Sequence, residues 1–175
     1  MNQIIEKLQG GDLRSKGRSD EVVKEVFDNP RLFGLVIDGM IYKDPVVRMR
    51  ASDAAEKITR ERPGYLASHK SRLINMISRI DQKEVRWHVA LILPRLQLTE
   101  IEREKVFQIL LSYLEDESKF VKTSAMQGLA DIAEQDRTYL SRVLDLVEDM
   151  VETGSPAIKS RGKKIRAHLR ELHPD

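Results

Sequence analysis

The stretch that decides the fold runs from residue 44 to residue 58 and reads DPVVRMRASDAAEKI. An aspartate before a proline is typical of a helix start, because proline lacks a donor that the first turn does not need, and the carboxylate can accept from the free amides. Apolar residues then recur at spacings of four, three and four: Val47, Ala51, Ala54 and Ile58. These spacings place them on one stripe of a helix, where small side chains allow another helix to approach closely.

The same pattern occurs four times along the chain. An apolar residue precedes a basic one, and small or apolar residues follow four, seven and eleven positions after the first. The starting residues are Val47, Val85, Val121 and Ile158, separated by 38, 36 and 37 residues. Another amphipathic segment precedes each, at about 31–42, 64–79, 100–115 and 137–152. Two helices in each repeat of this length predict an all-α fold in which successive units bury their faces by stacking.

Three of these segments carry a further likeness: DPVVRMRA (44–51), DQKEVRWHVA (81–90) and DESKFVKTSA (116–125). An acidic turn residue followed by Val-Arg and then alanine resembles the second helix of HEAT repeats, in the armadillo-type class. The resemblance implies an α-α superhelix of about four helical pairs, with units at 31–60, 64–97, 99–134 and 137–172. Residues 1–30 match poorly, and we interpret them as an N-terminal cap of two short helices joined by a basic, glycine-containing linker.

The resemblance also implies two features of side-chain placement. In HEAT repeats the turn aspartate and the arginine after valine form a hydrogen-bonded ladder between units. The matching pairs here are Asp44/Arg48, Asp81/Arg86 and Asp116/Lys122, with Ser155 replacing the aspartate in the fourth unit. Second helices line the concave surface of such solenoids. Residues on the face opposite the buried stripe of these helices are therefore expected to line that concave surface, which we call the inner wall.

Composition excludes several classes of function. Lys plus Arg number 30 against 28 Asp plus Glu, so the net charge of +2 is too small to imply a polyanionic partner. The chain has no cysteine, which removes disulfides, cysteine zinc sites and thiol catalysis. No apolar run is long enough to span a membrane. We therefore expect a cytoplasmic protein that has no membrane association.

No constellation for chemistry stands out. The histidines His69, His88, His168 and His173 have no metal-ligand spacing, and no carboxylate pair is forced into one pocket. The segment GGDLRSKGRS (10–19) lacks the lysine and hydroxyl residue that end a phosphate-binding loop, so we interpret it as a mobile basic linker. The expectation is a non-enzymatic chain with no cofactor and no metal.

The most informative candidates are apolar residues where a soluble helix should be polar. Four of them are expected on the inner wall: Met49, Trp87, Leu91 and Met126. They predict an adaptable anchor site for a partner protein segment. The alternative is that a tightly wound solenoid closes over these residues and makes them core.

Basic residues give the second part of the hypothesis. Acidic groups of a partner are expected to pair with Arg48, Arg86, Lys122 and Lys159, unless the repeat ladder occupies them. Helix 156–172 is strongly basic and follows an acidic one, and the two are expected to offset each other's charge. The alternative function is nucleic-acid binding, with Trp87 stacking on a base and a patch formed by Arg50, Arg161, Lys163 and Lys164.

Overall fold

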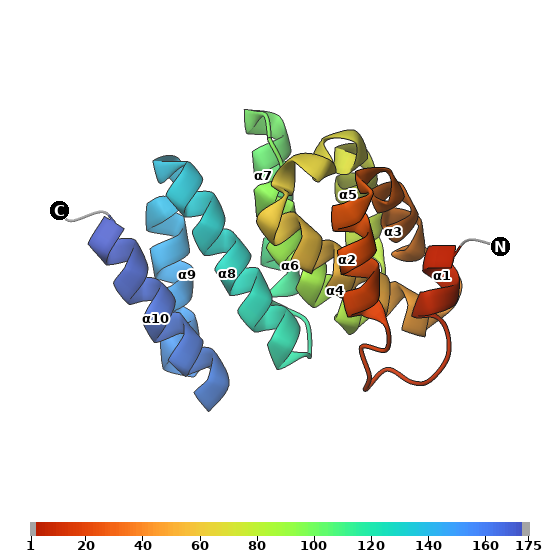
Figure 1. The fold of residues 1–175 in the computed structure, drawn as a ribbon. Coiled ribbons are helices and arrows are strands. Elements are labelled where there is room, and N and C mark those ends of the chain that lie inside the picture. The colour runs from red at the N-terminus through yellow and green to blue at the C-terminus, as the bar shows by residue number, and fades with distance from the viewer. Residues whose placement is uncertain (1–2, 173–175) are drawn as a thin grey trace. The chain divides into compact units, whose positions relative to one another are not determined.

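The computed structural model describes residues 3–172, and its regular elements are all helices (Figure 1). The chain divides into two compact units at the boundary between Gln97 and Leu98. The predicted all-α class is confirmed for the described residues, among which no strand occurs.

The described part of the first unit contains six α-helices, one of which is long and central. They are α1 (Gln3–Leu8), α2 (Ser19–Asp28), α3 (Phe33–Gly39), α4 (Pro45–Glu61), α5 (Lys70–Asn75) and α6 (Lys83–Ile92). Short 3-10 segments lie at Pro30–Leu32, Pro63–His69, Ile77–Arg79 and Leu93–Arg95. Helix α4 packs against α1, α2, α3 and α6, so the stretch at 44–58 forms the core of this unit.

The second unit is built from four α-helices. They are α7 (Glu100–Tyr113), α8 (Lys119–Gln135), α9 (Leu140–Thr153) and α10 (Pro156–Leu172), with a 3-10 turn at Arg137–Tyr139 before α9. Helix α10 packs along both α9 and α8, and α8 also packs on α7 (Figure 1). None of the helices in residues 3–172 combines the length and apolar character that crossing a bilayer requires.

The four predicted stripes are buried throughout. Their starting residues Val47, Val85 and Val121 are fully buried and Ile158 is 6% exposed. At the later positions, Gly162 shows how close the packing is, because a Cβ atom there would lie 2.7 Å from Cγ2 of Val151. Helices that carry these stripes pack together within each unit, α4 with α6 in the first and α8 with α10 in the second.

Side chains cap the starts of several helices, including the start predicted at Asp44. Asp44 accepts from the amide of Val46 at 2.8 Å, and Thr99 forms a reciprocal capping box with Glu102. Helix α6 begins after Gln82, whose side chain makes no capping bond. The two short N-terminal helices, α1 and α2, lie where the cap was expected.

The largest difference is the predicted helix at 64–79, which is broken into a 3-10 segment, the short α5 and a second 3-10 turn. Pro63 begins the first 3-10 segment. Near the end, the hydroxyl of Ser78 donates to the carbonyl of Ile74 at 2.8 Å, which is a local alternative to regular helix bonding. Apolar spacing alone does not distinguish these short turns from one continuous helix.

Candidate functional site

The candidate site is a pocket of about 260 Å³ in the first unit, which we call the Trp87 pocket. Three elements form it: the loop between α1 and α2, the middle of α4, and the middle of α6. Its lining residues are Leu13, Arg14, Ser15, Lys16, Met49, Arg50, Asp53, Trp87 and His88. In Figure 1 the loop is the long red trace that connects α1 to α2.

The loop has a defined conformation because three glycines and one arginine shape it. Gly10, Gly11 and Gly17 all have positive φ, at 78°, 75° and 53°. Such angles are readily available only to glycine, so the loop can turn sharply at both ends. The segment predicted to be a mobile linker is therefore a folded loop, and the side chain of Arg50 fills its interior.

Arg50 is 3% exposed and, within residues 3–172, donates only to backbone carbonyls. Its Nε donates to Ser15 at 3.0 Å, and one terminal nitrogen donates to Leu8 at 3.0 Å and to Gln9 at 3.1 Å. The other terminal nitrogen lies 3.5 Å from the carbonyl of Asp12. This arrangement corrects the prediction that Arg50 belongs to a nucleic-acid patch, because its guanidinium is enclosed and already bonded.

A network of alternating charges lies beside the loop. Lys57 donates to both Asp53 and Asp20 at 2.7 Å, and Asp20 also pairs with Lys16. Hydrogen bonds from Lys16 and then Lys57 lower the pKa of Asp20 to about 2. Asp53 additionally accepts from the hydroxyl of Ser19 at 2.6 Å. The two lysines and two aspartates balance, so this network adds no net charge to the pocket.

Two aromatic side chains of α6 form the opposite wall. The rings of Trp87 and His88 are 5.6 Å apart between centroids, in an edge-on arrangement. Trp87 is half-buried, so part of the indole faces the pocket. Burial lowers the pKa of His88 to about 4, so its imidazole is neutral near pH 7.

A second buried ion pair stabilises the packing of α4 against the end of α6. Arg95 donates to the carboxylate of Glu56 at 2.6 Å, to its backbone carbonyl at 2.8 Å and to the Thr59 hydroxyl at 3.0 Å. Burial alone would raise the pKa of Glu56, but the hydrogen bonds from Arg95 and Arg60 outweigh it and hold the pKa below its usual value. Glu56 is thus a structural anion of this unit.

The predicted apolar anchors separate into three cases. Met49 and Trp87 lie together in the pocket, although Met49 is only 7% exposed. Leu91 is half-buried on α6 outside the lining. Met126 corrects the prediction, because it is fully buried in the second unit, and its Sδ would lie 3.5 Å from a Cβ on Gly162.

Most predicted basic contacts are engaged within the protein. Arg48 donates to Gln82 at 2.7 Å, and Gln82 donates back to the carbonyl of Pro45 at 2.9 Å, which links the start of α4 to the N-cap of α6. Arg86 pairs with Asp81 at 3.0 Å within its own turn. Lys159 donates to the carbonyl of Glu152 at 2.8 Å. Asp81/Arg86 is thus one of the expected pairs, whereas Arg48 bonds to Gln82 in place of the expected aspartate.

The basic residues of α10 behave differently. Arg161, Lys163 and Lys164 are exposed and have no ion-pair partner among residues 3–172. Only the end of the helix matches the expected charge compensation, where Arg170 pairs with Glu148 of α9 at 2.5 Å. This surface remains the structural basis of the nucleic-acid alternative.

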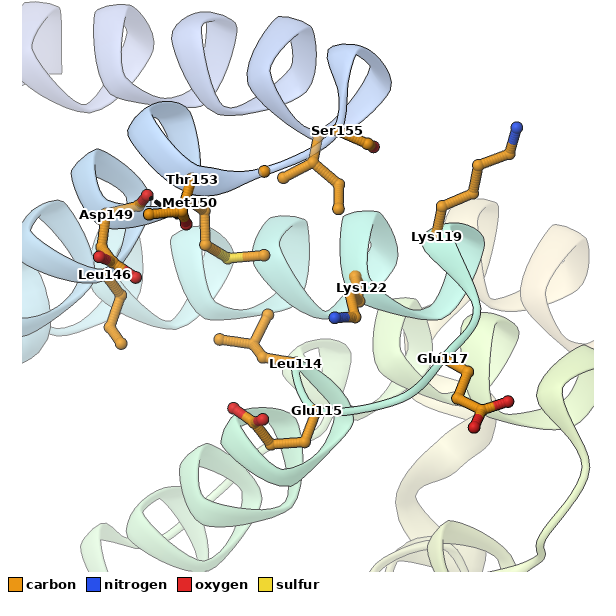
Figure 2. Close-up of a pocket in the computed structure, with 12 residues that line it drawn as sticks. Leu114, Glu115, Glu117, Lys119, Lys122, Leu146, Asp149, Met150, Thr153 and Ser155 are labelled. Carbon is orange, nitrogen blue, oxygen red and sulfur yellow. Dashed lines mark hydrogen bonds between the residues drawn. The ribbon is translucent and has the colours of Figure 1, made fainter.

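Lys122 lies in a second, larger pocket of about 490 Å³ within the second unit (Figure 2). Its apolar floor includes Leu114, Met150 and Ile158. Figure 2 shows Lys122 pointing toward Leu114, whereas Lys119 extends away from the other lining side chains. Asp116, the expected ladder partner of Lys122, accepts from the amide of Ser118 at 2.8 Å.

The charged residues that line this second pocket have both signs: Glu115, Glu117, Lys119, Lys122 and Asp149. The mixture favours no particular ligand. Among residues 3–172, no three histidine or carboxylate side chains gather closely enough to hold a metal ion. His173 lies outside the described residues.

No protein-family model matches this chain, and no curated protein sequence is significantly similar to it. The candidate sites are therefore the pockets, defined by their geometry.

Sequence reasoning missed the contribution of the loop, which supplies Leu13 and Arg14 to the Trp87 pocket. One available signal was the set of three glycines in GGDLRSKGRS, which predicts positive-φ turns. A second was the position of Arg50, three residues after Val47 and therefore close to the buried stripe of its helix. An arginine on a buried helix face requires hydrogen-bond acceptors, and the loop provides them.

Proposed function

We propose that this chain is a HEAT-like helical repeat protein that acts as a non-enzymatic interaction module in the cytoplasm. Three observations support the repeat assignment: the buried stripes recur at a constant period, helices that carry these stripes pack together within each unit, and the Arg48–Gln82 bond links the start of α4 to the N-cap of α6. The cysteine-free composition fits a reducing compartment.

The observation that carries the binding function is the half-buried Trp87 in a pocket walled by an ordered loop. Tryptophan is enriched at the energetic centres of protein interfaces, because its large ring excludes water over a wide area. A volume of about 260 Å³ suits one or two side chains of a partner segment. Met49 provides a deformable floor for such side chains.

Selection from a random peptide phage library on the full chain tests this function. We expect enriched peptides to bind wild-type protein at least tenfold more tightly than Trp87→Ala protein, measured by fluorescence anisotropy of labelled synthetic copies. Trp87→Phe serves as the matched control, since it retains an aromatic ring and should retain most of the binding. Peptides that bind both wild type and Trp87→Ala equally would show that the pocket is not the docking site.

The second candidate function is nucleic-acid binding through α10, favoured by the exposed Arg161, Lys163 and Lys164. A helix with several unpaired cations is the usual electrostatic footprint for phosphate contacts. The near-neutral total charge and the enclosure of Arg50 weigh against it. Salt-titrated binding to single-stranded DNA and RNA distinguishes the two functions.

A further inference from the structure

The Trp87 pocket contains two guanidinium groups that lack carboxylate partners among residues 3–172. Arg50 donates only to carbonyl oxygens, so its full positive charge persists inside the unit. Arg14 is exposed, lines the pocket, and forms no ion pair in the described part of the chain. A buried cation with only neutral partners gives its surroundings a positive potential, which is weakly screened because water is excluded.

The other charged groups nearby leave this potential in place. Lys16, Asp20, Lys57 and Asp53 form a balanced network. His88 contributes no charge near neutral pH because it is held in its neutral form. The carboxylate of Asp12 accepts from the backbone amide of Arg14 and is not part of the pocket lining.

The loop holds an apolar side chain next to the free cation. Leu13 is 41% exposed, although leucine side chains usually avoid water, and it lines the same pocket as Trp87 and Met49. The carbonyls that accept from Arg50 belong to residues on both sides of Leu13 and Arg14, namely Leu8, Gln9, Asp12 and Ser15. Arg50 thus fixes the positions of Leu13 and Arg14 in the lining of the pocket.

We propose that the Trp87 pocket recognises an acidic peptide segment, and that Arg50 is the positioning residue that holds the recognising loop. An apolar side chain of the segment occupies the space lined by Leu13, Met49 and Trp87, and a neighbouring carboxylate pairs with Arg14. Charge complementarity selects this partner over a basic or neutral one. The inference rests on the proposed docking function and names the chemistry of its partner.

The electrostatic part can be tested without any peptide, because Trp87 is the sole tryptophan of the chain. Iodide and caesium ions quench indole fluorescence and carry opposite charges. We expect the quenching constant of iodide to exceed that of caesium at least threefold in wild type, and the ratio to fall to about one in Arg14→Glu protein. Lys43→Glu changes the net charge equally at an exposed residue outside the pocket and should leave the ratio unchanged.

Specificity is tested with an array of nine-residue peptides that have a central Trp, Phe or Leu flanked by Glu, by Lys or by Ser. Wild type should bind the Glu-flanked set at least tenfold more tightly than the Lys-flanked set. Arg14→Glu should reverse this order, while Lys43→Glu should not. Binding by Trp87-dependent contacts with no preference for flanking charge would overturn the inference and leave the docking function standing.

The positioning role of Arg50 has its own readout. Arg50→Lys keeps the positive charge but cannot donate to carbonyls on both sides of the loop. Hydrogen exchange of amides in residues 9–18 should accelerate at least tenfold in this variant, with the rest of the unit unchanged, and the preference for Glu-flanked peptides should decrease. Unchanged exchange in the loop would show that Arg50 does not position it. If no peptide binds wild type in any set, the docking function fails, whereas equal quenching by iodide and caesium removes only the acidic preference.

Discussion

Gly17 and Arg50 occupy adjoining space so closely that residue 17 can have no side chain without displacing the guanidinium. A Cβ atom on Gly17 would lie 2.6 Å from Cζ of Arg50, well inside van der Waals contact. Two residues 33 positions apart in the sequence are thereby coupled: Gly17 belongs to the loop between α1 and α2, and the side chain of Arg50 fills the interior of that loop. This contact fixes the loop against α4.

Gly17→Ala should therefore destabilise the protein more than the same change at Gly10. Both glycines have positive φ, at 53° and 78°, so both substitutions incur backbone strain of ~1–2 kcal/mol. Only Gly17 also faces Arg50, whereas nothing lies within 4 Å of a Cβ on Gly10. We expect Gly17→Ala to cost about 1 kcal/mol more than Gly10→Ala, measured by urea unfolding. Equal losses of unfolding free energy in the two variants would mean that the loop can shift to accommodate a side chain next to Arg50.

Gly162→Leu should overpack the contact between α10 and α9. The Cβ atom would lie 2.7 Å from Val151, so the helices must separate or Val151 must change rotamer, at a cost of ~1–3 kcal/mol. Gly64→Leu is the control, because nothing lies within 4 Å of a Cβ at that position. Thermal unfolding followed by circular dichroism measures both. A silent Gly162→Leu substitution would contradict the packing of these two helices.

Stability should decrease as the pH falls from 7.5 to 5 because of His88. Its pKa is about 4 in the folded protein and about 6.5 when unfolded, so the unfolded state binds more protons between these values. The contribution of neutral His88 to the free energy of unfolding is present above pH 6.5 and is lost as the pH falls toward 4. We expect a decrease of about 2 kcal/mol by pH 5. His88→Gln cannot titrate and should flatten the dependence over this range. A slope that persists unchanged in His88→Gln protein would assign the effect to other groups.

Trp87→Ala should affect binding more than folding. A fully buried tryptophan costs ~3–5 kcal/mol on truncation, but Trp87 is half-buried, so we expect about 1–2 kcal/mol by urea unfolding. Its emission should be quenched by acrylamide at a rate between those of a core and a free indole. An emission maximum typical of a dry core, together with a large loss of stability, would make Trp87 a packing residue.

Neither DNA nor RNA should bind tightly at physiological salt. Contacts to several phosphates lose affinity steeply as salt rises, because condensed counterions are released on binding. The double variant Lys163→Glu plus Lys164→Glu reverses two charges of α10, which does not line the Trp87 pocket. It should leave peptide binding at that pocket intact. Nanomolar, salt-sensitive nucleic-acid binding that this double variant abolishes would establish α10 as the functional surface instead.

The sequence by itself determined the helices and which of their faces are buried. The stripe beginning at Val47, the aspartate cap at Asp44 and the capping box at Thr99 are all local signals, since helical periodicity and first-turn amides depend only on residues within a few positions. These features were predictable because neighbouring residues supply both the cause and the consequence.

Tertiary structure alone decided which charged and apolar side chains remain available. Arg50 was expected on a surface patch, yet it bonds to carbonyls 35 to 42 positions earlier in the chain. Every residue type carries the same backbone carbonyl, so no sequence pattern marks these acceptors. Met126 became core and Arg14 became a free cation at a pocket for the same reason: each outcome depends on which distant segment packs beside the residue.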